Sequence, residues 1–315
     1  MRVTALAGGI GAGKFLRGLT RVVPGDRLTV VVNVADDLEI HGLHVSPDPD
    51  SVTYWLGDAF DRERGWGRRG ESFRANGELA MFDADAAWFA LGDLDLATHL
   101  FRTGILGAGG SLSDATERIA RRFGVAARLL PATDDAVRTR IDAVDHRTGE
   151  PLDLHFQEYW VRRRAADPVK GVRYLGASEA TPAPGVLDAI ADADVVVFCP
   201  SNPVVSIGPI LAVPGIRDAV QRRRGSAVGV SGIVGDAPVS GMADKLMPAV
   251  GIEVTAAGVA EHYRDLLAAW LVDDVDRELI PRVGSLGMRC ASTDTIMTDD
   301  ERAEAVARAA LDLIA

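Results

Sequence analysis

A short apolar strand that ends abruptly in a rigid polar loop limits the fold of this chain more than any other segment. Residues Val195 to Cys199 form a β-branched run typical of a buried parallel strand. The loop after the strand contains Pro200, Ser201, Asn202, Pro203, Ser206, Gly208 and Pro209. Ligands bind outside the carboxyl ends of strands in open α/β sheets. The loop is therefore either a cradle for a phosphate or a sugar, or an ordinary tight connection.

Two apolar runs near the N-terminus, Arg2 to Ala7 and Leu28 to Asn33, predict core strands with a helix over residues 15–23 between them. The same alternation returns in the second half, with strands expected near 226–231, 252–254 and 269–272 and helices near 209–223, 259–267 and 299–314. The sequence thus predicts an α/β fold with a Rossmann-like parallel sheet built from residues 1–50 and 177–315. The inserted segment 51–176 is expected to form a helical layer and a β-hairpin subdomain around Thr148-Gly149.

Composition excludes several classes of partner. The net charge of −11 argues against nucleic acid and anionic membranes, because such binding needs a basic surface. No apolar run approaches the roughly 20 residues that cross a bilayer, and no signal-like segment precedes the first strand. Cys199 and Cys290 are the only cysteines and lie far apart in sequence, which indicates reduced thiols. A cytoplasmic protein is expected.

The first predicted strand runs into a glycine-rich turn, Gly8-Gly9-Ile10-Gly11-Ala12-Gly13-Lys14-Phe15. The turn departs from a P-loop, because Phe15 stands where a Ser or Thr would hold magnesium. It also lacks the third glycine of the dinucleotide fingerprint, since Lys14 stands there. Glycines still allow close backbone approach, and amides at a helix N-terminus favour an anion. Gly9 and Gly11 are therefore candidate phosphate contacts, and the alternative is a packing turn.

Carboxylates gather after the second predicted strand. Asn33 ends that strand, Asp36 follows it, and Asp48 and Asp50 come next to prolines shortly afterwards. Magnesium prefers oxygen ligands, usually one or two carboxylates with water and substrate phosphates. Asp36 and Asp50 are therefore candidate metal ligands, with Asn33 and Asp48 beside them. Helix capping and turn formation are the alternative roles of these aspartates.

Further polar groups are candidate ligand contacts. A helix expected to begin near residue 93 carries Thr98 and His99, and His99 is either an acid or base or a hydrogen-bonded structural histidine. Three successive arginines, residues 162–164, form either a bidentate anion site or a solvated basic face. Trp66 either stacks on a planar ring or anchors a loop. Lys245 either neutralises a diphosphate or lies exposed on a helix.

Six blocks of residues occur in a characteristic order: Gly8-Gly9-x-Gly11, Val32-Asn33-x-x-Asp36-Asp37, Ser46-Pro47-Asp48-x-Asp50, Leu91-Gly92-Asp93-x-Asp95-x-Ala97-Thr98-His99, His155-Phe156-Gln157-Glu158, and Pro200-Ser201-Asn202-Pro203-x-x-Ser206-Ile207-Gly208-Pro209. In this order they resemble the 2-phospho-L-lactate transferase family of coenzyme F-420 biosynthesis, whose bacterial members are called phosphoenolpyruvate transferases. The resemblance extends over nearly the whole chain, through Val239-Ser240-Gly241 and Gly258-Val259-Ala260-Glu261.

The resemblance implies a Rossmann-like homodimer that moves a phosphoenolpyruvyl or 2-phospho-L-lactyl group. The donor would be linked to guanosine diphosphate, the acceptor would be the hydroxyl of the deazaflavin Fo, and GMP would be released. Magnesium is the implied cofactor, with Asp36 and Asp50 at the metal and the acceptor hydroxyl and Asp48 nearby. The implied donor contacts are Gly9, Gly11, Ser201, Asn202, Pro203, Ser206 and Gly208, with Lys245 and Arg162 as weaker phosphate partners. The bias toward arginine over lysine favours a bacterial protein, and hence the phosphoenolpyruvyl donor.

Two other function classes remain open at this point. A related family of gluconeogenesis factors, which are nucleotide-sugar-binding regulators, has a similar glycine-rich opening. The clustered aspartates and the block from Asp93 to His99 favour the enzyme over such a regulator. A nicotinamide-dependent dehydrogenase is disfavoured by the missing third glycine.

Overall fold

The computed structural model describes residues 1–314, the side chain of Ala86 excepted. Its strands are β1 Val3–Ala7, β2 Leu28–Val32, β3 Leu38–Ile40, β4 Leu43–Val45, β5 Arg128–Pro131, β6 Arg138–Val144, β7 Pro151–His155, β8 Val169–Leu175, β9 Val195–Phe198, β10 Ala227–Val230, β11 Ile233–Val234, β12 Ala237–Pro238, β13 Ala269–Asp273 and β14 Arg289–Thr293.

The α-helices are α1 Gly9–Val22, α2 Pro47–Leu56, α3 Arg74–Phe82, α4 Asp93–Gly107, α5 Leu112–Arg122, α6 Val186–Asp192, α7 Gly208–Ala212, α8 Ile216–Arg222, α9 Ala243–Leu246, α10 Ala256–His262, α11 Ile280–Ser285 and α12 Asp300–Ile314. Shorter 3-10 or π turns are η1 Gly25–Arg27, η2 Ala84–Ala87, η3 Glu158–Arg162, η4 Ala177–Glu179, η5 Pro203–Ile207, η6 Arg224–Ser226, η7 Met247–Val250 and η8 Asp274–Leu279.

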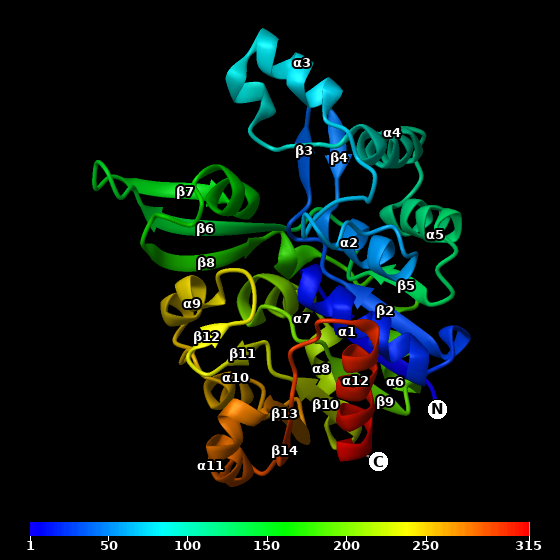
Figure 1. The fold of residues 1–315 in the computed structure, drawn as a ribbon, viewed down its shortest axis with the longest axis vertical. Coiled ribbons are helices and arrows are strands. Elements are labelled where there is room, and N and C mark those ends of the chain that lie inside the picture. The colour runs from blue at the N-terminus through cyan, green and yellow to red at the C-terminus, as the bar shows by residue number, and fades with distance from the viewer. Residues whose placement is uncertain (315) are drawn as a thin grey trace.

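Within the described residues, seven strands form one parallel sheet in the order β14-β13-β10-β9-β1-β2-β5 (Figure 1). On one side of β1 lie β2 and then β5. On the other side lie β9, β10, β13 and β14, in this order from the centre to the edge. Strand order therefore reverses between β1 and β9, and such a switch point opens a crevice beyond the carboxyl ends of the strands. The predicted Rossmann-like sheet is confirmed.

The sheet is apolar on both faces because helices cover both. Along β9, Val195 and Val197 face a core that includes α1 and α12, whereas Val196 and Phe198 face a second core that includes α6, α8 and α10. Figure 1 shows α1 and α12 side by side, one near each end of the chain. Strands buried on both faces read as unbroken apolar runs rather than as alternating ones. This explains why the run at 195–199 is so uniformly apolar.

The segment 51–176 contributes both separate layers and one strand of the central sheet. Its antiparallel sheet, in the order β7-β6-β8, extends to one side of the molecule in Figure 1, and α3 lies at the top. The predicted hairpin at Thr148-Gly149 joins β6 and β7. In addition, β5 pairs with β2 at the edge of the central sheet. The inserted segment is thus continuous with the core through this strand.

Several element predictions need correction. Residues 252–254 form no strand in the described structure, because Ile252 packs its side chain inward from a loop and Thr255 caps α10 through its hydroxyl. The helix expected over 209–223 is divided into α7 and α8, since Pro214 and the left-handed Gly215 (φ +87°) interrupt it. The edge strands β5 and β14 carry a weaker apolar pattern and were not predicted.

No single helix in residues 1–314 combines the length and apolarity that a membrane span requires. The segments Pro203–Ala212 and Ile216–Arg222 reach that length and composition only together, and they meet at a bend of 94°.

Candidate functional site

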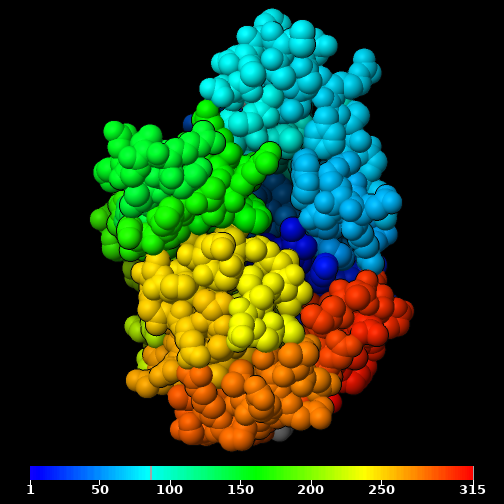
Figure 2. All heavy atoms as spheres, turned by 60° about the vertical axis from the view of Figure 1, so that its left-hand side comes forward, coloured from blue at the N-terminus to red at the C-terminus, as the bar shows by residue number. Residues whose placement is uncertain are grey.

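A cavity of about 890 Å³ opens at the switch point of the sheet. The segments that follow β1, β2, β9, β10 and β14 contribute to its lining, together with α2, α4 and the segment after β7. Figure 2 shows the hollow, with the dark blue N-terminal segment at its floor and green, yellow, red and pale blue segments around it. Because strand ends supply the floor, residues far apart in sequence face one another here.

The glycine turn and the loop after β9 are in close contact at the floor. Ser201 Oγ donates to the carbonyl of Gly8 at 2.9 Å, and the amide of Gly8 lies 3.4 Å from the same oxygen. A Cβ atom on Gly11 would lie 2.5 Å from the carbonyl oxygen of Pro200. Gly9 has φ +75°, a left-handed conformation that favours glycine. The predicted contacts Gly9, Gly11 and Ser201 all line the cavity.

Two asparagines hold the loops around the floor. Asn202 Oδ1 accepts hydrogen bonds from the amides of Val204 and Val205 and thereby caps η5. Asn33 is buried and donates through Nδ2 to Asp48 Oδ2 at 2.9 Å and to the carbonyl of Val205 at 3.1 Å. Asn33 therefore lies behind the cavity wall, where its side chain links Asp48 to the loop after β9.

Asp36 and Asp48 form a buried acidic group at the cavity wall. Burial, assisted by the charge of Asp48, raises the pKa of Asp36 well above its usual range. Burial raises the pKa of Asp48 to about 7, with the charge of Asp37 acting in the same direction. Asp37 itself accepts a hydrogen bond from Ser46 at 2.7 Å and lies 2.8 Å from His44 Nε2. Burial thus favours the neutral forms of these carboxyls, and a bound cation would favour their charged forms.

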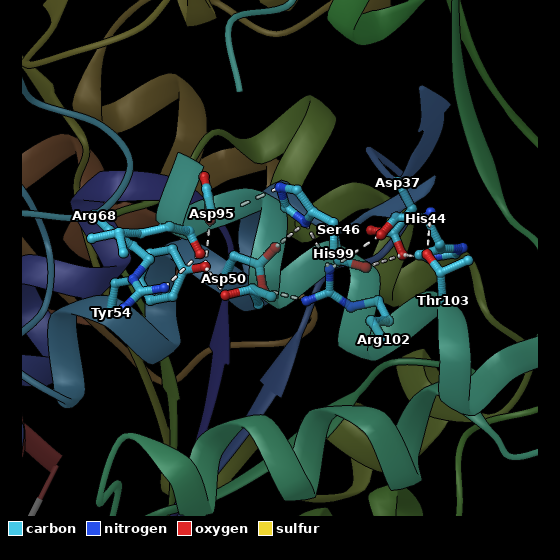
Figure 3. A network of polar contacts seen from close by, with 12 residues as sticks. Asp37, His44, Ser46, Asp50, Tyr54, Arg68, Asp95, His99, Arg102 and Thr103 are labelled. Atoms are coloured by element: carbon cyan, nitrogen blue, oxygen red, sulfur yellow. Dashed lines mark hydrogen bonds and ion pairs between the residues drawn. The ribbon is translucent and has the colours of Figure 1, made fainter. Parts of the chain in front are cut away.

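Asp50 belongs to a network of side chains from α2 and α4, which Arg102 connects through the carbonyl of His44 to the group around Asp37 (Figure 3). The guanidinium of Arg102 is paired with Asp50 Oδ1 and also lies 3.3 Å from His99 Nδ1. His99 Nδ1 is 3.6 Å from Asp50 Oδ2, and its Nε2 is 3.9 Å from Asp95 Oδ1. The hydroxyl of Tyr54 donates to Asp95. Arg102 is thus the cation that neutralises Asp50 in the interior.

Burial also shifts the pKa values of the groups on α4. It lowers the pKa of His99 to about 4, so the imidazole is neutral at pH 7. Burial and then the charge of Asp50 raise the pKa of Asp95 to about 7. Because Arg102 donates only, His99 Nδ1 acts as the acceptor toward it and Nε2 carries the proton. Nε2 has no hydrogen-bond partner among the described residues.

The carboxylates fit a divalent cation that prefers oxygen. Asp36 Oδ1 and Asp50 Oδ2 are buried without a hydrogen-bond partner in the described structure, and both side chains line the cavity. Asp50, Asp95 and His99 place ligand atoms within 4.8 Å of one another. Magnesium prefers carboxylates, whereas a histidine ligand suits transition metals. The carboxylates of Asp50 and Asp95 suit magnesium, and the nearby imidazole of His99 would suit a transition metal.

The rim of the cavity carries aromatic and basic side chains. Trp66 and Trp160 line it from two separate segments and remain 40% and 38% exposed. Lys14, on the first turns of α1, and Arg164, after η3, also line it. Partly exposed tryptophans at a cavity rim are suited to stacking on a planar ring.

Other predicted contacts lie outside the lining of the cavity. Lys245 is 58% exposed and pairs with Asp244 at 3.4 Å, because α9 directs it toward solvent. Gly208 begins α7 beside the Tyr174 hydroxyl and does not line the cavity in the described structure. Thr98 lies behind the wall, 3.0 Å from the hydroxyl of Tyr54.

The remaining predicted contacts, His99, Asn202, Pro203 and Ser206, do line the cavity.

The candidate contacts from the sequence did not include Tyr54, Arg102 or Trp160, and Asp95 entered only as a member of a sequence block. Asp95, His99 and Arg102 are spaced by four and three positions, which places them on one face of a helix. That spacing was the available signal. Nothing in the sequence indicated that Arg102 faces Asp50, since 52 positions separate the two.

Comparisons with known proteins identify the family and the fold. The family model described as 2-phospho-L-lactate transferase CofD matches residues 3–311. A phosphoenolpyruvate transferase from Streptomyces griseus is 51% identical over 99% of this chain and 98% of its own length. The enzyme of the same name from Thermobifida fusca is 47% identical over the same shares of the two chains. A UPF0052 family protein from Bacillus halodurans shares the fold, with a TM-score of 0.64 at 19% identity over 98% of each chain.

The match covers almost the entire chain, and the six sequence blocks lie around one cavity or directly behind its wall. The chain belongs to the 2-phospho-L-lactate transferase family and is a transferase of coenzyme F-420 biosynthesis.

Proposed function

We propose that the protein transfers a phosphoenolpyruvyl group from a guanosine diphosphate-linked donor to the ribityl hydroxyl of Fo and releases GMP. The observation that carries the proposal is one cavity lined by a glycine turn and by carboxylates, with Asp48 against the turn and with unpartnered oxygens on Asp36 and Asp50 in the described structure. Relatives named phosphoenolpyruvate transferase, about half identical to this chain, support this donor over the 2-phospho-L-lactyl one.

The donor diphosphate is proposed to lie against the turn from Gly9 to Gly11 and the loop from Ser201 to Ser206. Backbone amides at the start of α1 favour an anion, and the absence of side chains permits close approach. Lys14 lines the cavity from the same helix and supplies a positive charge. This placement puts the bond between the two phosphates near the acidic wall.

The deazaflavin ring is proposed to stack at the rim, on Trp66 and Trp160. Both indoles line the cavity and keep more than a third of their surface exposed. Stacking of aromatic rings adds about 0.5–1.5 kcal/mol beyond the burial of apolar area. The ribityl chain of Fo would then extend from the rim toward Asp36 and Asp50.

In the proposed reaction the ribityl oxygen forms a bond to the phosphorus that carries the enolpyruvyl ester. The bond from that phosphorus to the oxygen of GMP breaks, and GMP leaves with the electron pair. Asp36 or Asp50 accepts the hydroxyl proton. Magnesium, when held by Asp36 and Asp50, supplies charge stabilisation to the diphosphate. Catalysis would depend mostly on positioning, as is typical of phosphoryl transfer.

A homodimer is proposed from the same family relationship. Met81 and Phe82 on α3 and Leu100 and Phe101 on α4 are between 49% and 88% exposed. Exposed apolar groups of this kind are common at protein interfaces. Light scattering of the purified protein tests the proposal, which a monomeric mass at working concentration would refute.

The decisive experiment incubates the protein with Fo, magnesium and either the phosphoenolpyruvyl or the 2-phospho-L-lactyl donor, and identifies the deazaflavin product by mass spectrometry. We expect a phosphoenolpyruvyl-Fo product together with GMP, and no product after chelation of magnesium. Preference for the lactyl donor would correct the donor assignment. Binding of a nucleotide sugar without any Fo product would overturn the proposed function.

A further inference from the structure

The three successive arginines after η3 have three different environments. Arg162 pairs with Asp85 at 3.1 Å. Arg163 pairs with Asp167 at 2.5 Å and with Asp145 at 2.7 Å. Arg164 lines the cavity, and no described residue forms an ion pair with it. Two of the arginines are therefore paired with carboxylates of the chain, and one remains free to meet a ligand.

The backbone that presents Arg164 is strained. Arg164 and Ala165 have φ values of +55° and +50°, the left-handed region that side chains other than glycine rarely adopt. The amide of Ala165 donates to the carbonyl of Tyr159 at 2.9 Å, and the buried Asp167 holds Arg163 from the other side. Strained backbone persists where surrounding contacts impose it, and it is common at binding sites.

The free arginine is one of few basic side chains in the lining of the cavity. Four carboxylates line the cavity: Asp36, Asp48, Asp50 and Asp95. Within the described residues, Lys14 and Arg164 are the lysine and arginine side chains of the lining. The proposed donor carries a diphosphate. It also carries a carboxylate, which belongs to the three-carbon acid esterified to the reacting phosphorus. Lys14 lies on the helix that follows the glycine turn, whereas Arg164 comes from the segment between β7 and β8, shown green in Figure 2.

We propose that Arg164 binds the carboxylate of the three-carbon acid on the donor, an inference that rests on the proposed function. A guanidinium presents a planar pair of N–H donors that match a carboxylate, and such pairs are frequently bidentate. Trp160, from the same segment, lines the rim where the acceptor ring is proposed to stack. Arg164 would thus hold the acid between the diphosphate and the acceptor and orient the reacting phosphorus.

The test compares the donor with its carboxylate methyl ester, using the full chain and calorimetry at constant magnesium. The unchanged protein should bind the free acid at least about 10-fold more tightly than the ester. Arg164→Gln should bind acid and ester about equally, with the affinity for GDP unchanged. Arg164→Lys should retain part of the discrimination, because the positive charge remains. Arg162→Gln is the matched control, since it removes an adjacent charge outside the cavity, and it should discriminate as the unchanged protein does.

Full discrimination in Arg164→Gln would overturn the inference, as would an equal loss of affinity for acid, ester and GDP. Thermal unfolding confirms that each variant is folded, and the GDP measurement serves as an internal control for site integrity. If the unchanged protein binds GDP but does not distinguish acid from ester, the inference fails while the proposed function stands. If it binds neither GDP nor the donor, the proposed function fails, and the inference fails with it.

Discussion

Arg102 on α4 and Asp50 on α2 form an ion pair in which the side chains are only 1% and 6% exposed. The pair links two helices that line the cavity, and Arg102 also contacts His99 and the carbonyl of His44. Buried pairs of this kind fix geometry more than they add stability, because both charges lose their hydration. The position of Asp50 at the cavity wall therefore depends on one guanidinium.

Replacing Arg102 by Met should destabilise the protein strongly. The change leaves Asp50 buried without its cation, and breaking a buried pair in this way costs about 3–5 kcal/mol. Urea unfolding of the single variant and of Arg102→Met combined with Asp50→Asn measures the effect. The double variant should recover part of the loss, because it also removes the unpaired charge. A loss below about 1 kcal/mol in the single variant would contradict the prediction.

Asp36→Asn should separate activity from stability. The amide cannot hold a divalent cation as a carboxylate does, so we expect turnover to fall at least about 100-fold. The free energy of unfolding should stay equal or rise, because burial and then the charge of Asp48 disfavour the charged carboxylate that the neutral amide replaces. Steady-state transfer assays and urea unfolding provide the two measurements. Turnover within a few-fold of the unchanged protein would remove Asp36 from the mechanism.

Gly11→Ala should weaken binding of GDP and lower stability by about 1–3 kcal/mol. The added methyl group would lie 2.5 Å from the carbonyl oxygen of Pro200 and would push the glycine turn away from the loop after β9. Gly104→Ala on α4 is the control, since its Cβ meets no atom within 4 Å. Calorimetry with GDP and thermal unfolding distinguish the two. Equal behaviour of the two variants would show that the turns are not tightly packed.

Trp160→Ala should reduce the affinity for Fo about 10-fold without changing that for GDP. Loss of the indole removes the stacking surface at the rim, whereas the glycine turn is untouched. Quenching of Fo fluorescence on titration with protein reports binding independently of transfer. Trp160→Phe should restore most of the affinity, because an aromatic ring remains. If the Ala variant binds Fo normally, the ring does not stack at this position.

Asp167 should make the protein sensitive to acid. The hydrogen bond from Arg163 holds the pKa of the buried Asp167 carboxyl below its usual range. A carboxylate with a lowered folded-state pKa contributes stability above its unfolded pKa of about 3.9 and loses it as the pH falls through the lower folded-state value. Asp167→Asn should therefore be less stable than the unchanged protein at pH 7 and show a flatter loss of stability below about pH 4. Thermal unfolding across this pH range tests the prediction. An equally steep loss of stability below about pH 4 in the two proteins would contradict it.

Most of the central sheet could be predicted from the sequence, because buried parallel strands carry a local apolar signal. Val195 to Phe198 and Leu28 to Val32 were located within one or two residues by that signal alone. The edge strands were harder to predict, since each is short and begins with an arginine, and pairing with a single neighbouring strand defines it. A similar difficulty arose at residues 252–254. Their apolar residues predicted a strand, although the backbone there forms a loop from which Ile252 packs inward.

For the site, the sequence by itself determined which loops follow the strand ends, which glycines and aspartates they carry, and to which family the chain belongs. These features are local, and the topology of an α/β sheet brings strand ends together. Tertiary structure alone decided that Arg102 neutralises Asp50 and that only Arg164 of three adjacent arginines reaches the cavity. Ion pairing depends on contacts between distant segments and on backbone conformation, neither of which is encoded in the spacing of residues along the chain.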